Sequence, residues 1–280
     1  GDVYKRQARG WDDLSEMIKL YEENGLAVDE QLICQYLQDA RISKDFAIYY
    51  DLFNKYRSDY QVEKILDGTV SESIVLRAER ASMDERLSLL GLIFDSVTAQ
   101  LRMVCERENI LDLVTGQLKT LKEKLKDVSG AAALLSEMIE AEREKLERGK
   151  QSSSISPQTQ RETRFMLEYL EEFRAAVMQS GTAQKDEFSI VRESFAQKVA
   201  ELKGLAADGG RALENVFSFC EKAFADGDEI LIFVTELTAN YYSARFIGRY
   251  GCDRYYMHNK QLQFDQRQQE IIKRMDEIQW

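Results

Sequence analysis

The chain has 280 residues, with 38 Lys and Arg against 49 Asp and Glu, and a formal net charge of -11. This acidic balance argues against a general nucleic-acid binder or a binder of anionic membranes, because both need a cationic surface. The sequence holds 1 Pro, where average usage would give roughly 14, so helix stops are few and an all-α fold is expected. The four Cys form no CxxC pair, which suits a reducing cytoplasm better than a disulfide framework or a zinc site.

No run of apolar residues approaches the roughly 18 that a membrane span needs, and the densest one is residues 230–234. The sequence therefore predicts neither a membrane segment nor a signal peptide. Residues 1–7 resemble translated adapter sequence, so we interpret them as a non-native leader and leave them out of fold reasoning. On this interpretation we expect the chain to be a fragment of a longer protein.

Residues 8–70 predict a small bundle of three or four helices. Three apolar stripes at helical spacing indicate the individual helices. The stripes begin at Leu14, Leu32 and Phe46. Gly25 is placed to stop the first helix, while Asp29 and Ser43 are placed to open the second and the third.

Residues 71–148 predict a long helical hairpin or coiled coil. Apolar residues over 83–128 follow a four-three spacing, which favours one long helix, or two that meet at a kink near Gly116, packed against the helices that follow. Glu108 is the one interruption of this seam. We expect Glu108 where the seam is wet or broken, because burying a carboxylate without a cation costs much free energy.

The stretch 149–160 is rich in Ser, holds the single Pro, and predicts a linker. Residues 161–280 beyond it predict a C-terminal helical bundle. A weaker break at 205–210 contains a Gly pair, and we interpret it as an ordinary turn between helices. The run that follows Asp228 has β-branched residues but the helical period, so it predicts a helix with Asp228 as its N-cap.

Catalytic and metal-binding patterns are scarce. The nearest approach to a P-loop, residues 204–211, lacks the Lys and the hydroxyl residue that such a loop needs. With 1 His in the chain, a zinc site or a His-dependent catalytic site would depend on His258, which we interpret as an ordinary surface or interhelical residue. The acidic segment 226–229 lacks the spacing of a calcium loop and is interpreted as a helix cap. The sequence thus predicts no catalytic residue and no metal site.

Residues 240–260 have the most unusual composition, because Arg and aromatic residues alternate there in an otherwise acidic chain. This combination is typical of protein-interface hot spots and of surfaces that stack on bases. Of these two functions, a protein interface is preferred. The alternative is a helical core whose aromatic rings face inward while Arg stems cover them. The candidate interface residues are Arg245, Arg249, Arg254, Tyr255 and Tyr256.

The segment 8–15, with the sequence Ala-Arg-Gly-Trp-Asp-Asp-Leu-Ser, resembles the sensor-2 segment of MoxR-type AAA+ ATPases. Residues 18–56 look like the helical lid of a bacterial branch of that family. Residues 233–243 look like its C-terminal helical region. The resemblance covers 8–66 well and the remainder loosely.

In this resemblance Arg9 matches the sensor-2 arginine, which senses nucleotide at the head of the lid. The resemblance implies a parent enzyme that uses ATP and Mg²⁺, forms a homo-oligomeric ring, remodels partner proteins and works with a von Willebrand A-domain protein. It implies no nucleic-acid or membrane partner.

The P-loop, the Walker B motif, sensor 1 and the arginine finger of that family do not occur in this sequence and would lie upstream of Arg9. For the fragment alone we therefore expect no cofactor and no ATPase activity. The 83–128 seam supports an alternative of a different class, a free-standing helical scaffold or adaptor without nucleotide chemistry.

Overall fold

The computed structural model describes residues 2–37, 39–126, 130–180, 187–225 and 227–260, with side chains from Gly10 onward. Within these residues all regular structure is helical, which confirms the predicted all-α class. The helices are α1 (Asp2–Glu23), α2 (Glu30–Tyr36), α3 (Ala40–Tyr60), α4 (Val62–Leu66), α5 (Glu72–Arg80), α6 (Met83–Lys124), α7 (Ala131–Gln151), α8 (Pro157–Ser180), α9 (Glu187–Ala223), α10 (Glu229–Ala239) and α11 (Tyr241–Tyr250). Residues 253–260 are helical as well.

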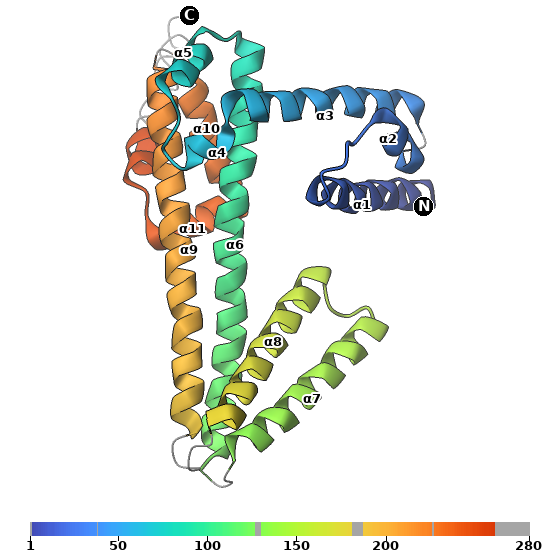
Figure 1. Ribbon diagram of the computed structural model, residues 1–280, viewed down its shortest axis with the longest axis vertical. Helices are drawn as coiled ribbons and strands as arrows, with labels where there is room; N and C mark the ends of the chain where they lie inside the picture. The colour runs from blue at the N-terminus through green and yellow to red at the C-terminus, as the bar shows by residue number, and fades with distance from the viewer. Residues whose placement is uncertain (1, 38, 127–129, 181–186, 226, 261–280) are drawn as a thin grey trace, which may run out of the picture.

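The long helices α6 and α9 run antiparallel and form a column along the long axis of the molecule (Figure 1). The α7–α8 hairpin packs against one end of the column. The short helices α4, α5 and α10 surround the other end, and α11 packs near the middle of the column, where it contacts Glu108 of α6 (Figure 1). From the end near α4, α3 extends away from the column and carries α1 and α2, which stand apart from the column (Figure 1).

The predicted long helix is confirmed as α6, and it continues through Gly116 without a break. Ser82 caps it by accepting the backbone N–H of Glu85 at 3.4 Å. The first two seam residues, Met83 and Leu87, are exposed, and the seam becomes buried further along the helix. Seam residues that are buried are Leu90, Val97, Leu101, Val104, Leu111, Val114 and Leu121. They contribute to the apolar clusters that join α6 to the other column helices.

By length and composition alone, α6 could also cross a membrane, the one such helix among the described residues. That test is weak, because the core helix of a globular protein passes it too. In α6, 44% of the most apolar window is buried inside the protein. The helix thus has protein partners for much of its apolar surface.

The predicted turn at 205–210 is wrong, because α9 runs unbroken through it. A Cβ at Gly209 would lie 3.2 Å from Leu101 Cδ2 and 3.5 Å from Phe246 Cε2. The glycine therefore lets α9 approach α6 and α11 closely. A Gly pair signals a turn only where the backbone conformation requires glycine, and here the close packing at Gly209 requires glycine instead.

Gly209→Leu is expected to lower the free energy of unfolding by about 1–3 kcal/mol, because the larger side chain forces α9 away from its neighbours. Gly210→Leu is the matched control, since a Cβ there meets no atom within 4 Å. Urea unfolding followed by circular dichroism measures both. Equal stability of the two variants would show that the close approach at position 209 is unimportant.

The N-terminal bundle has its own small core of Leu14, Ile33, Leu37 and Ala47, from α1, α2 and α3. Two of its predicted boundaries are confirmed. Gly25 follows α1 with φ at 65°, and Asp29 caps α2 by accepting the N–H of Leu32 at 2.8 Å.

The third boundary is wrong, because Asp39, not Ser43, caps α3. Asp39 accepts the N–H groups of Arg41 and Ile42, at 2.9 and 3.2 Å. Ser43 lies one turn inside the helix and is buried. Its hydroxyl donates to the carbonyl of Leu37 at 2.8 Å, so it satisfies a backbone group where the chain enters α3.

The segment 149–160, predicted as a linker, contains the end of α7, a turn and the start of α8. The turn covers 152–156 only. Pro157 opens α8, a position where its missing N–H leaves no helical bond unmade. Both helices share an apolar cluster with α6 and with the first part of α9, so this segment is the tip of a helical hairpin.

The helix predicted after Asp228 is confirmed as α10. Asp228 stands at the N-cap position, but its side chain makes no capping hydrogen bond there. Asp228 is thus the N-cap residue as predicted, but the predicted capping hydrogen bond from its side chain is wrong. Phe233, Val234 and Leu237 of α10 are buried in the main apolar cluster, which explains why the helical period prevails over the β-branched composition.

Candidate functional site

Arg9, the predicted nucleotide-sensing residue, belongs to α1, but its side chain lies outside the described residues. Its role therefore stays a prediction. The next aromatic residue along the helix, Trp11, packs edge-on against Phe46 of α3, with ring centroids 5.2 Å apart. The indole remains 42% exposed, so Trp11 links α1 to α3 at the rim of the small bundle.

Two of the predicted interface arginines form ion pairs inside the molecule. Arg245 Nη2 lies 3.1 Å from Glu108 Oε2, and Arg249 Nε lies 2.9 Å from Glu108 Oε1. Tyr250 donates its hydroxyl to Glu108 Oε1 at 2.6 Å. Burial and this bond raise the pKa of Tyr250 to about 12. Glu108 thereby joins α6 to α11.

The expectation that Glu108 sits in a wet part of the seam is wrong, because the residue is only 3% exposed. It is tolerated there because two guanidinium groups and a hydroxyl reach its carboxylate. The predicted register of the seam is consistent with this, since Glu108 still faces another helix.

The remaining candidates also make contacts within the protein. Arg254 Nε lies 3.1 Å from Glu214 Oε2, and its Nη1 contacts Glu221. Tyr255 is buried, with its hydroxyl 2.9 Å from that of Thr238. Tyr256 keeps 48% of its surface exposed. The arginines are thus paired within the protein, while Tyr241 and Tyr250 are exposed like Tyr256, and the interface role of 240–260 stays a prediction.

His258, interpreted as an ordinary surface or interhelical residue, lies between helices. Its ring stacks on Phe217 of α9 with centroids 5.8 Å apart. Its Nε2 is 2.9 Å from Glu221 Oε1. Among the described residues no three His, Cys, Asp or Glu side chains are grouped as a metal site requires.

A groove where α3 meets α6 is the site that the sequence did not reveal. It encloses about 440 Å³. One wall is the outer face of α3, and the other is the first part of α6 with the residues that lead into it. The lining residues are Tyr49, Leu52, Phe53, Tyr56, Ser82, Asp84, Glu85, Leu87, Ser88, Gly91, Leu92 and Asp95.

The lining of this α3–α6 groove combines aromatic rings with carboxylates. Tyr49 is 59% exposed and Leu52 is 43% exposed. The charged residues in the described lining are Asp84, Glu85 and Asp95, all acidic. Partial burial raises the pKa of Asp95. The site can therefore receive a group that is both apolar and positively charged.

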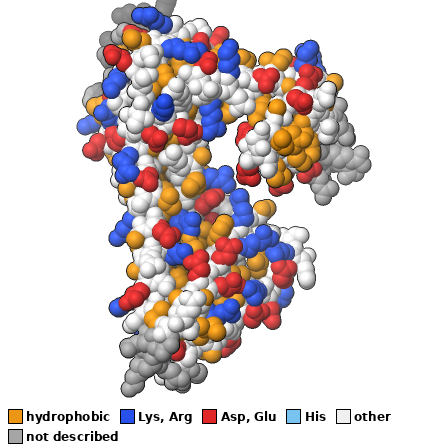
Figure 2. Space-filling model, viewed as in Figure 1, with side chains coloured by type: hydrophobic (Ala, Val, Ile, Leu, Met, Phe, Trp, Pro, Cys, Tyr) orange, Lys and Arg blue, Asp and Glu red, His pale blue; other side chains and the backbone are white. Residues whose placement is uncertain are grey.

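A second hollow, about 290 Å³, lies between α1 and α3. Trp11, Ile18 and Phe46 contribute to its lining, and Tyr49 and Phe53 line both hollows. The apolar surface is thus continuous from α1 across α3 to α6. Figure 2 shows hydrophobic side chains gathered on the N-terminal bundle, which a cleft separates from the rest of the molecule.

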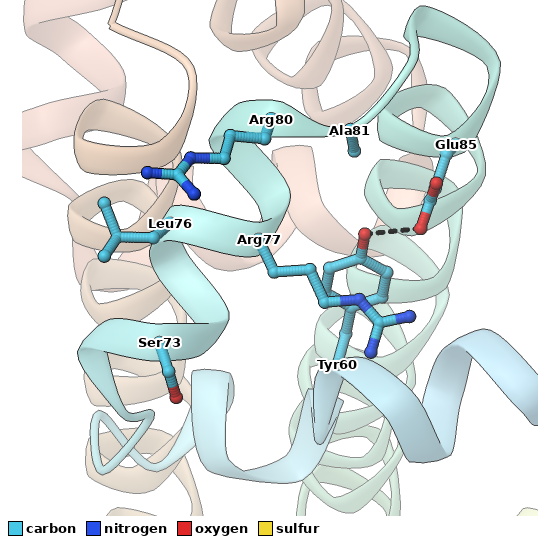
Figure 3. A pocket seen from close by; sticks show the side chains of 7 residues that line it. All are labelled: Tyr60, Ser73, Leu76, Arg77, Arg80, Ala81 and Glu85. Carbon is cyan, nitrogen blue, oxygen red and sulfur yellow. Dashed lines mark hydrogen bonds between the residues drawn. The ribbon is translucent and has the colours of Figure 1, made fainter.

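The corner between α3 and α6 is held by Tyr60 and Glu85. The Tyr60 hydroxyl donates to Glu85 Oε1 at 2.6 Å (Figure 3). The Arg77 guanidinium lies 4.9 Å from the Tyr60 ring centroid, whereas Arg80 points away from it (Figure 3). Figure 3 shows the hollow beside α5 that Tyr60, Arg77, Arg80 and Glu85 help to line. Because its two arginines point in different directions, they do not form a joint binding site for an anion.

Tyr60 is fully buried, and burial together with the bond to Glu85 raises its pKa to about 12. An unfolded tyrosine ionises near pH 10. The protonated hydroxyl therefore stabilises the fold fully below about pH 10, and this contribution is lost as the pH rises to about 12.

Tyr60→Phe is expected to lower the free energy of unfolding by about 1 kcal/mol at pH 7, because Glu85 loses its hydroxyl donor. Above pH 10 the variant should lose less further stability than the parent. Urea unfolding at pH 7, 10 and 11.5 measures this, with Tyr49→Phe as the exposed control. A parallel decline of the Tyr60→Phe variant and the parent over this range would contradict the assignment.

No protein-family model matches the chain, and neither a curated protein nor a solved structure matches it.

Proposed function

We propose that residues 8–70 act as the nucleotide-sensing lid of a MoxR-type AAA+ ATPase, and that residues 71–280 form a helical arm that contacts partners or substrate. The observation that carries the proposal is the N-terminal bundle. Helices α1 to α3 have their own core and extend away from the column (Figure 1), whereas the apolar residues among 60–66 of the proposed lid are buried in the main cluster of the column. A lid must be able to follow a bound nucleotide without unpacking the rest of the molecule.

Within this proposal Arg9 supplies the chemistry of the lid. A guanidinium group donates two parallel hydrogen bonds to phosphate oxygens and stabilises negative charge there. Trp11 follows on the same helix and packs against Phe46, so the segment that carries Arg9 is anchored to α3. The upstream core would hold ATP and Mg²⁺, which this chain does not hold alone.

The proposal places the parent protein in the cytoplasm as a homo-oligomeric ring, with a von Willebrand A-domain protein as a partner. The column and the α7–α8 hairpin offer long helical surfaces for such contacts (Figure 1). The free cysteines Cys34, Cys105, Cys220 and Cys252 agree with a reducing compartment.

The test is ATP hydrolysis by the protein that the longer reading frame encodes, compared with this chain alone. We expect a P-loop domain encoded in frame upstream, Mg²⁺-dependent phosphate release from the longer protein, and none from this chain above a boiled control. A reading frame without a P-loop domain would refute the proposed ATPase lid and favour the alternative, a free-standing helical scaffold or adaptor. Phosphate release that follows the concentration of this chain would also overturn it.

A further inference from the structure

We propose that the α3–α6 groove binds a basic amphipathic segment of a partner protein, with an Arg or Lys side chain placed beside an apolar one. This interaction does not depend on nucleotide chemistry. It uses a different surface from the arginines of α11, which are paired within the molecule.

The α3 wall of the groove is exposed at Tyr49 and Leu52, whereas Phe53 and Tyr56 are partly buried against the main apolar cluster. Tyr49 and Phe53 lie with ring centroids 6.1 Å apart, and the Tyr49 hydroxyl has no hydrogen-bond partner in the described part of the chain. Leu87, on the opposite wall, is 38% exposed. A contiguous apolar surface of this kind, rimmed by polar groups, marks a protein-interaction site.

The negative charges of the groove favour a positively charged partner. Asp84 and Asp95 make no ion pair with any described residue, whereas the third carboxylate, Glu85, is engaged by Tyr60. No Lys or Arg is part of the described lining. Asp84 and Asp95 are eleven residues apart on α6, about 16 Å along the helix, so one basic side chain of the partner pairs with one of them. Such a cation is also attracted to the faces of Tyr and Phe rings. An acidic or purely apolar segment would leave the carboxylates unpaired.

The groove also has room for a backbone to come close. Gly91 lies in its lining, and a Cβ built there meets no atom within 4 Å. A partner helix can therefore approach α6 at this point. Because the Tyr60–Glu85 hydrogen bond holds the corner between the two helices, little conformational freedom needs to be lost on binding.

Gly91→Leu fills the groove and gives the sharpest test. It should not disturb the fold, since it replaces a helical glycine, which costs about 1 kcal/mol relative to Ala, at an open site. Gly116→Leu is the matched control, because it lies in the same helix and is equally open. Circular dichroism and thermal melting of both variants establish that they are folded.

The probes are two synthetic 16-residue peptides with the same leucine and phenylalanine face, one flanked by arginines and the other by glutamates. Isothermal titration calorimetry at 150 mM salt measures their binding to the full chain. We expect the arginine peptide to bind the parent and Gly116→Leu alike. Its binding to Gly91→Leu, and to the Asp84→Asn, Asp95→Asn double variant, should be at least about tenfold weaker.

Equal binding of the arginine peptide to Gly91→Leu and Gly116→Leu would overturn the proposal, since it would reflect general attraction to an acidic protein. Equal binding of the glutamate peptide, or no binding of either peptide to the parent at 1 mM, would overturn it as well. Sedimentation of the parent provides a further check. A dimer that Gly91→Leu abolishes would assign the groove to a second copy of the chain instead.

Discussion

Replacing both Arg245 and Arg249 with Met is expected to lower the free energy of unfolding by about 3–5 kcal/mol, because a buried carboxylate loses its cations. Glu108 is 3% exposed, and without the two guanidinium groups the Tyr250 hydroxyl is its one remaining partner among the described residues. Methionine keeps most of the apolar stem, so the change in packing is small.

Urea unfolding measures this effect, and a third substitution identifies its cause. Adding Glu108→Gln to the double variant removes the unpaired charge and should restore at least half of the lost stability. The control is Met at Arg41 and Arg192, two exposed arginines without an ion pair to any described residue. A loss in the control as large as in the test variant would show that the ion pairs with Glu108 contribute little.

In the longer ATPase that the proposed function implies, Arg9→Ala is expected to slow ATP turnover about tenfold or more. An arginine that contacts the transferred phosphate commonly contributes several kcal/mol to the stabilisation of the transition state. Arg9→Lys should restore little, because a point charge on a flexible stem does not reproduce the planar guanidinium. Steady-state phosphate release, normalised to the folded fraction, is the measurement.

Two further variants separate sensing from folding. Trp11→Ala should lower the melting temperature more than turnover per folded molecule, because the indole packs on Phe46. Arg41→Ala removes an exposed arginine from the same bundle and should leave turnover unchanged. Turnover by Arg9→Ala at the parental rate would refute the sensor-2 assignment.

The helices that follow a regular apolar period were predictable from the sequence. The apolar spacing of the seam predicts α6 because each turn of a helix places one of these residues on the same side. The cap at Asp29 is predictable because its side chain accepts the N–H of a residue only three positions away. Signals of this kind lie within a few residues of the structure that they predict.

The failures have one physical cause, which is that the deciding contact comes from a distant part of the chain. Position 209 holds a glycine inside a helix because Leu101 and Phe246 crowd the place of a Cβ. Glu108 is buried because Arg245 and Arg249 reach it from α11. In neither case does the neighbouring sequence contain the partner.

The α3–α6 groove was unpredictable for the same reason. Its aromatic wall was visible in the sequence as a helix stripe, but such a stripe normally predicts a core. Only the angle between α3 and α6 leaves Tyr49 and Leu52 exposed and sets them opposite Asp95.

The geometry of α3 has a mechanical consequence. The helix spans 21 residues, which corresponds to about 32 Å at 1.5 Å rise per residue. At the column it ends at Gln61, where the backbone turns with φ at 49° into α4. Because the Tyr60–Glu85 hydrogen bond holds this corner, α3 tilts only when that contact is strained, and a tilt of about 10° would move its far end by about 6 Å. A small change of angle at the column therefore displaces the bundle that carries Arg9 by more than the length of a hydrogen bond.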